Sequence, residues 1–320
     1  MYRIGIDLGG TNIAVGLVNE KYEILKKVSA PTLAATRTAQ ELVDAMAELC
    51  QRVCEACGIS LADVEAIGVA SPGAVNFDEG IVEYCNNLHF RHFPMREHLQ
   101  AKTGVQHVHV ENDANAAAWG EAVAGAARGT KSSVTITLGT GVGGGVIIGG
   151  KLLSGFNFAG GELGHMVIER GGVPCSCGRR GCFEVYSSAT GLIRMTKEKI
   201  EECEKTGRKT LMAELAAKSG KVNGRTAFDA MRGGDGAALE VVEKYISYLA
   251  IGIANIVNIF EPEVICIGGG VSGEGEGLLA PVREIVEKER YGAEFVQATR
   301  LTVATLGNDA GIIGAAFLGI

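Results

Sequence analysis

The chain has 320 residues, more than a single hydrophobic core usually supports, so we expect two domains. Its formal net charge of -7 argues against the clustered Lys and Arg that nucleic-acid binding needs, and we expect no nucleic-acid partner. The chain enters an apolar run at Tyr2 without a signal-like segment. No apolar stretch is long enough to span a bilayer, so we expect a cytoplasmic protein without a membrane partner.

The first third of the chain predicts strands at its start and a helix after them. Residues 2–29 indicate three short strands, with turns at 9–11 and 19–21. Apolar positions at helical spacing predict a helix over 38–57, which Gly58 ends. A strand over 66–70 should follow, and it runs directly into Ser71-Pro72-Gly73.

The opening pattern of strand, glycine turn and strand returns later in the chain. A strand over 105–110 is followed by a helix that Asn112 or Asp113 should cap and Gly129 should end. Residues 134–153 then repeat the pattern of the N-terminus, which predicts a duplicated domain. Beyond this repeat we expect a long helix over 236–260, a strand and turn over 263–270, and a buried helix at the end.

Three glycine turns directly follow apolar strands, where open α/β sheets bind ligands. Glycine lets backbone N–H groups come close to phosphate oxygens. Beside the first turn, Asp7 is placed to hold Mg²⁺ directly or through water. The turns comprise Gly9, Gly10, Thr11 and Asn12; Gly139, Thr140 and Gly141; and Gly268, Gly269 and Gly270.

The middle turn also matches the G-x-G-x-x-G fingerprint of dinucleotide-binding enzymes, which makes an NAD-dependent oxidoreductase a competing hypothesis. That fingerprint should open a helix, whereas residues 145–150 indicate the return strand of a hairpin. The GxxxxGK[ST] loop of Walker-type ATPases is absent from the sequence.

Asp113 is the candidate general base. A helix cap is the ordinary role for an Asp at this position. The neighbouring Asn112 offers a donor and an acceptor to a sugar diol, and the helix N-terminus should keep the Asp113 carboxylate ionised and able to accept a proton. One base, Mg²⁺ and phosphate-binding amides are a sufficient set for phosphoryl transfer.

Four soft ligands with the spacing H-x9-C-x-C-x4-C predict a closed, structural zinc site: His165, Cys175, Cys177 and Cys182. Free thiols in a glycine loop are the alternative. Glu162 and Glu184 flank the ligands, so zinc could order a substrate-binding loop while the second nitrogen of His165 meets a sugar hydroxyl.

The combination of DLGGTN, ASPG, ENDANAAAWGE, TLGTGVGGG, GGELGH with CSCGRRGC, and IGGGVS resembles the ROK family, most closely its bacterial glucokinases. The resemblance covers nearly the whole chain. It implies an α/β fold of the actin-like, RNase H-like ATPases, with two related domains whose mixed sheets are flanked by helices around a central cleft. The smaller domain would comprise 1–117 with about 305–320. The larger, 118–304, would hold the zinc loop at 162–184 and the adenosine-binding elements.

The resemblance also implies ATP-dependent phosphorylation of glucose at its 6-hydroxyl by a homodimer, with Asp113 as the base. The sugar contacts would be Gly73, Asn112, Asp113, Glu162, His165 and Glu184. The residues near the phosphates would include Thr11, Asn12, Thr140 and Gly141, and Gly268 to Val271 would lie near the adenosine.

Two further alternatives remain open. Kinases of the family for N-acetylglucosamine, N-acetylmannosamine, fructose or allose share the catalytic set, and polyphosphate stays open as an alternative donor. A non-catalytic sugar-sensing regulator is the alternative from another class. The first strand begins within the first few residues, so we expect no DNA-binding segment, and a sensor should have lost Asp113.

Overall fold

The computed structural model describes residues 1–319. The chain divides into two compact units. The first comprises Met1–Thr135, Gly145–Gly161 and the segment from Ala304 onward, and the second comprises Ile136–Gly144 and Glu162–Val303. The last segment of the chain therefore folds with the first.

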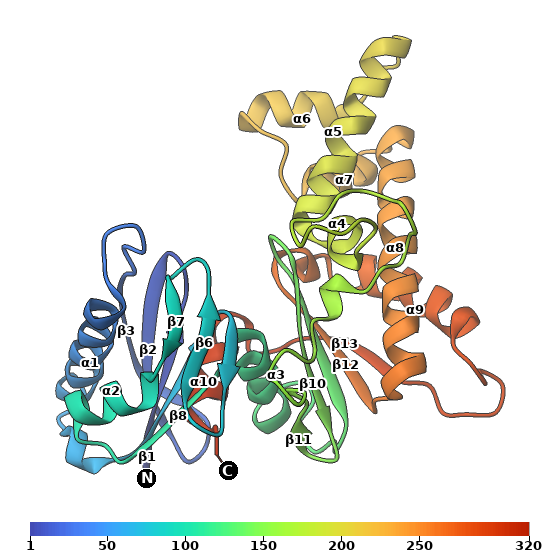
Figure 1. Ribbon diagram of the computed structural model, residues 1–320. Coiled ribbons are helices and arrows are strands. Elements are labelled where there is room, and N and C mark those ends of the chain that lie inside the picture. The colour runs from blue at the N-terminus through green and yellow to red at the C-terminus, as the bar shows by residue number, and fades with distance from the viewer. Residues whose placement is uncertain (320) are drawn as a thin grey trace. The chain divides into compact units, whose positions relative to one another are not determined.

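A mixed five-stranded sheet forms the centre of the first unit, in the order β3-β2-β1-β4-β8 (Figure 1). The three antiparallel strands predicted at the N-terminus are present as β1 (Tyr2–Leu8), β2 (Asn12–Asn19) and β3 (Ile24–Pro31). Strands β4 (Val64–Ser71) and β8 (His107–Asn112) run parallel to β1. The carboxyl ends of β1, β4 and β8 therefore meet at one edge of the sheet.

Helices cover both faces of this sheet. On one face, α1 (Ala39–Glu55) packs on β2 and β3, and α2 (Met95–Thr103) packs on β8. Thr38 begins α1 with a capping box, because its hydroxyl accepts from the Glu41 N–H while the Glu41 carboxylate accepts from the Thr38 N–H. On the other face, α10 (Ala310–Ala316) lies against β1, β4 and α3 (Asp113–Val123).

A row of glycines explains how α10 approaches the sheet so closely. Gly5 on β1 pairs with Gly16 on β2 and with Gly68 on β4. A Cβ atom at Gly5 would lie 1.8 Å from the carbonyl oxygen of Ile312, and one at Gly68 would lie 1.7 Å from that of Ala315. Only glycine therefore lets the backbone of α10 rest directly on the strands.

A small antiparallel sheet completes the first unit. It consists of β5 (Ala74–Asn76), β6 (Ile81–Cys85) and β7 (Phe90–Phe93) in sequential order. It follows the end of β4, so it extends the edge at which the carboxyl ends of the parallel strands meet.

The second five-stranded sheet has the order β11-β10-β9-β12-β13. The predicted repeat is present in it as β9 (Ser133–Leu138), β10 (Val142–Ile148) and the two-residue β11 (Lys151–Leu152), followed much later in the chain by β12 (Val264–Gly268) and β13 (Arg300–Val303). The predicted helix over 236–260 is confirmed as α8 (Gly236–Phe260). The other helices of the second unit are α4 (Phe183–Ser187), α5 (Ala189–Thr206), α6 (Leu211–Ser219), α7 (Thr226–Arg232) and α9 (Glu276–Glu289).

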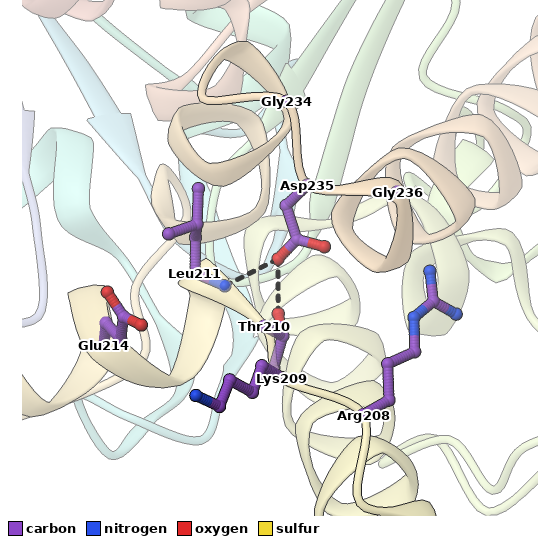
Figure 2. Close-up of a pocket in the computed structure, with 8 residues that line it drawn as sticks. All are labelled: Arg208, Lys209, Thr210, Leu211, Glu214, Gly234, Asp235 and Gly236. Atoms are coloured by element: carbon purple, nitrogen blue, oxygen red, sulfur yellow. Dashed lines mark hydrogen bonds between the residues drawn. The ribbon is translucent and has the colours of Figure 1, made fainter.

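Asp235 joins two of these helices. One carboxylate oxygen accepts from the N–H groups of Ala237 and Ala238 at the start of α8. The other accepts from the hydroxyl of Thr210 and the N–H of Leu211 at the start of α6, as Figure 2 shows. Asp235 lies in a shallow pocket of about 270 Å³. Protein donors already occupy the acceptor positions of its carboxylate, so the role of Asp235 is to connect the two helices.

Two sequence-based boundaries were wrong. Strand β8 begins and ends two residues later than the predicted 105–110, and α3 ends at Val123 instead of continuing to Gly129. The second difference has a clear cause: the buried carboxylate of Glu121 accepts from the N–H groups of Ala126, Thr305 and Leu306, which turns the chain out of the helix. Among residues 1–319, no helix combines the length and apolar character needed to cross a bilayer.

Candidate functional site

Asp113 and Asp7 both lie at the edge where the parallel strands of the first unit end. Asp7 is the last residue of β1 that pairs with β4, opposite Ala70, and Ser71 at the end of β4 lies opposite Asn112 on β8. Asn112 is the N-cap of α3, since its side-chain oxygen accepts from the N–H groups of Ala114 and Asn115 at 2.9 and 3.2 Å. The cap is thus Asn112, which leaves the exposed carboxylate of Asp113 as the first side chain of the helix.

Gly73 is joined to this edge by Asn112. The side-chain amide of Asn112 donates to the carbonyl of Gly73 at 3.0 Å. Gly73 has a φ of 100°, and a Cβ atom there would lie 2.1 Å from the carbonyl oxygen of Tyr84. A larger residue would therefore displace the small sheet from the N-cap of α3.

Both acids have raised pKa values. Burial and repulsion from Asp113 raise the pKa of Asp7 to about 6, while Lys27 opposes this shift. The side chain of Asp113 is accessible to solvent, yet the protein atoms around its carboxylate reduce hydration enough to raise its pKa. Bonds to Ala114 and Asn112 act in the opposite direction. Loss of hydration therefore outweighs the stabilisation of the charged form that we expected from the helix N-terminus.

The first glycine turn is held by a threonine that the motif search did not single out. Thr32 is fully buried, and its hydroxyl donates to the carbonyl of Gly9 at 2.6 Å. Its N–H donates to the carbonyl of Thr11 at 2.8 Å. The register of the β2–β3 hairpin, in which Asn12 faces Pro31, is the signal that could have found it. Gly10, Thr11 and Asn12 remain exposed.

Lys27 and Asp309 are two further residues that sequence reasoning missed. They form an ion pair, and Lys27 is the nearby positive charge that acts on Asp7. Gly311 at the start of α10 also approaches Asp7, because a Cβ atom there would lie 3.2 Å from its carboxylate. The closing segment of the chain thus contributes to the surroundings of Asp7.

In the second unit, the other two glycine turns lie next to each other. Gly269 has a φ of 85°, and a Cβ atom there would lie 2.5 to 2.6 Å from backbone atoms of Leu138, the residue before Gly139. The carboxylate of Glu184 accepts from the N–H of Val142 at 3.1 Å, so it holds the end of the turn formed by Gly139, Thr140 and Gly141. Val271, after the third turn, is buried.

The four predicted zinc ligands converge in the second unit. Their ligand atoms lie within 4.8 Å of one another. The Sγ atom of Cys175 is 3.7 Å from Nδ1 of His165, and the Sγ atoms of Cys177 and Cys182 are 3.6 Å apart. Ligands at about 2.3 Å from a central ion stand about 3.8 Å apart at tetrahedral angles, so the four residues fit a closed zinc site.

Backbone bonds pre-form this cluster. The Cys175 N–H donates to Arg179 at 2.8 Å and the Phe183 N–H donates to Met166 at 2.7 Å, which closes the loop around the thiols. Hydrogen bonds from Arg179 lower the pKa of the Cys177 thiol, whereas burial raises that of Cys182. The Sγ atom of Cys175 also lies 3.8 Å from Oε1 of Glu184, so one residue joins the cluster to the turn at Val142.

The predicted site residues therefore fall into two groups. The first unit brings together Asp7, the turn at 9–12, Gly73, Asn112 and Asp113. The second brings together the turns at 139–141 and 268–270, His165, Glu184 and the three cysteines. Glu162 precedes the short 3-10 turn Leu163–His165, where its carbonyl accepts from the N–H of His165.

Known proteins match this chain along nearly its whole length. The ROK family matches residues 3–320. Glucokinases from Thermotoga maritima and Halalkalibacterium halodurans are 39% and 38% identical to it, covering 98% of this chain in both cases and 95% and 94% of their own lengths.

Among solved structures, a ROK family glucokinase from Streptomyces griseus in complex with glucose and AMPPNP is 35% identical. It aligns with a TM-score of 0.80 and covers 99% of both chains. This chain thus shares its fold with a ROK family glucokinase over nearly its whole length. The chain is a member of the ROK family, with the fold of its actin-like ATPases.

Proposed function

We propose that this protein is a sugar kinase that transfers the γ-phosphoryl group of ATP to the 6-hydroxyl of glucose, giving glucose 6-phosphate and ADP. The observation that supports this most directly is the convergence of Asp113, Asp7 and the glycine turn at 9–12 on one sheet edge. Glucokinases among the relatives, and the glucose and AMPPNP in the related crystal structure, support the same substrates.

Asp113 is the general base in this proposal. Its carboxylate accepts the proton of the 6-hydroxyl as the sugar oxygen forms a bond to the γ-phosphorus. The bond from that phosphorus to the bridging oxygen breaks, and its electron pair stays on ADP. The raised pKa of Asp113 makes its carboxylate a stronger proton acceptor than an ordinary Asp.

The remaining residues bind and position the two substrates. Gly73, Asn112, Glu162, His165 and Glu184 would bind sugar hydroxyls. The turns at 9–12 and 139–141 would bind phosphate oxygens through backbone N–H groups, with Gly268 to Val271 near the adenosine. We further propose a smaller domain of 1–117 with about 305–320 and a larger domain of 118–304.

Two metals belong to the proposal. Asp7 would hold Mg²⁺, which neutralises phosphate charge when bound. The cluster of His165, Cys175, Cys177 and Cys182 would hold a structural zinc ion, because four protein ligands leave no open position. Since Cys175 contacts Glu184, the zinc ion would order a carboxylate that also touches a phosphate-binding turn.

The alternatives concern the substrate and the class of protein. Other hexoses, including the N-acetylhexosamines, fructose and allose, fit the same catalytic set, and so does polyphosphate as donor. A non-catalytic sugar sensor would have no use for a base at the start of α3. We propose a cytoplasmic protein and, as the resemblance implies, a homodimer.

A coupled assay of ADP release tests the function. Glucose, mannose, fructose, N-acetylglucosamine and N-acetylmannosamine are compared at equal concentration, with ATP or polyphosphate as donor. Glucose should give the highest kcat/KM with ATP. A higher value for another sugar would replace glucose as the substrate, and the absence of ADP release with every sugar would overturn the kinase proposal.

A further inference from the structure

A cavity of about 550 Å³ lies within the first unit, on the Glu111 side of β8. Segments far apart in the sequence line it: the turn after β5, the end of β8, helix α3, the segment at 150–158 and the end of the chain. None of the residues that we assign to phosphate, sugar or metal lines this cavity. Its volume is in the range of small-molecule sites.

Aromatic and aliphatic side chains form much of the wall. Phe77, Trp119 and Phe158 line the cavity together with leucines at 152, 153 and 318. The indole N–H of Trp119 donates to the carbonyl of Phe317 at 2.8 Å, which fixes the orientation of the ring. Phe158 has a φ of 62°, a left-handed conformation that is rare for a bulky residue.

One end of the cavity is polar. Glu111 is only 2% exposed, and its Oε1 atom accepts from the Asn112 N–H at 2.8 Å and from the Asn115 amide at 3.1 Å. Ser154 also bonds this carboxylate, and burial raises its pKa. A carboxylate has about four acceptor positions, so Glu111 retains capacity for one further donor.

A second polar group lies beside Glu111. His109 precedes it by two residues, so the two side chains lie on the same face of β8. The His109 ring stacks on Phe77, with centroids 5.9 Å apart, and Gly319 packs against it. Its Nδ1 atom is buried without a hydrogen-bond partner among the described residues, which is unusual for a buried polar atom.

We propose that this cavity binds a small uncharged molecule that combines a flat ring with a hydroxyl or N–H donor. The ring packs between the aromatic side chains, and the donor meets Glu111. The carboxylates of Asp78 and Glu111 disfavour an anion, and Lys151 together with the apolar side chains disfavours a cation. Because Glu111 also bonds the backbone of Asn112, the ligand acts on the first turn of α3; its effect on phosphorylation rests on the proposed function.

The fluorescence of Trp119 tests the site directly, because it is the single tryptophan of the chain. Phenol is the probe, and anisole is its matched partner without a donor. We expect a saturable change in fluorescence with phenol and about fivefold weaker binding of anisole, the value of one net hydrogen bond. Glucose at saturation should not displace phenol, because the cavity lies apart from the proposed sugar contacts.

Three variants make the test specific. Leu153→Phe narrows the cavity at a side chain that is 37% exposed, so it should fold normally and weaken phenol binding at least tenfold. Leu239→Phe, at an exposed position on α8, is the control and should bind as the wild type does. Glu111→Gln should reduce the preference for phenol over anisole.

The proposal is overturned by a fluorescence change that does not saturate, by equal phenol affinity in wild type and Leu153→Phe, or by competition from glucose. Equal affinity for phenol and anisole in the wild type would overturn the role of Glu111 in recognition. None of these results depends on kinase activity, so the proposed function and the cavity are tested separately.

Discussion

Replacing Asp7 with Asn should stabilise the protein at neutral and alkaline pH. The pKa of this carboxyl is raised from 3.8 to about 6, a difference of about 2 units. At 1.36 kcal/mol per unit this corresponds to about 3 kcal/mol, which we reduce to about 2 kcal/mol because the side chain is partly exposed to water. The folded state favours the protonated form, so the stabilisation by Asp7 is full below pH 3.8 and is lost as the pH rises through about 6.

Urea unfolding without divalent cations measures this effect. At about pH 8, Asp7→Asn should exceed the wild type in free energy of unfolding by about 2 kcal/mol, and the difference should vanish near pH 4. Asp113→Asn is the comparison variant, because it removes the repulsion and the hydration loss of its own carboxylate but leaves the burial of Asp7 in place. The reasoning would be refuted if Asp7→Asn were no more stable than the wild type at pH 8, or if its gain in free energy of unfolding were the same at both pH values.

Magnesium should change this difference in unfolding free energy in favour of the wild type. If Asp7 holds the ion, Mg²⁺ with nucleotide raises the unfolding free energy of the wild type at pH 8 more than that of Asp7→Asn. If Mg²⁺ stabilised both proteins equally, Asp7 would not be a metal ligand. The conclusion that its pKa is raised would still stand.

Three further substitutions test the other parts of the site. Asp113→Asn should lower kcat by about 10² to 10⁴ while glucose affinity, measured by calorimetry, stays nearly constant, because it removes only the proton acceptor; retained turnover would contradict that role. Cys177→Ser should lose stoichiometric zinc in elemental analysis and weaken glucose binding, whereas a fully active wild type without zinc would refute the site. Thr32→Val keeps the shape of the side chain but removes the hydroxyl that donates to Gly9. It should raise the KM for ATP several-fold with little change in the KM for glucose, and equal changes in both would indicate a general loss of stability.

Much of the site could be predicted because its chemistry is local in the sequence. Glycine after an apolar strand, Asn-Asp before a helix, and three cysteines and a histidine within 18 residues each specify a backbone conformation or a ligand set from neighbouring residues. Motifs of this kind predicted Asp7, Asp113 and the zinc ligands, and the cysteine cluster of the structure matches the tetrahedral spacing of zinc.

Residues that act through distant partners could not be found in this way. The hydroxyl of Thr32 supports Gly9 across 23 positions, and Lys27 pairs with Asp309 across 282. Glu121 ends α3 early because it binds backbone groups at 305 and 306, whereas the local pattern favoured a helix up to Gly129. In each case the decisive interaction exists only after strands and helices have packed.

By itself the sequence determined the type of most elements and singled out the candidate reactive groups, since periodicity, glycine turns and ligand spacing act over a few residues. Only the tertiary structure decided that the end of the chain packs beside Asp7, that loss of hydration outweighs the helix terminus at Asp113, and that five segments enclose a cavity next to Glu111. Burial and charge depend on all atoms within a few ångströms, whatever their distance along the chain.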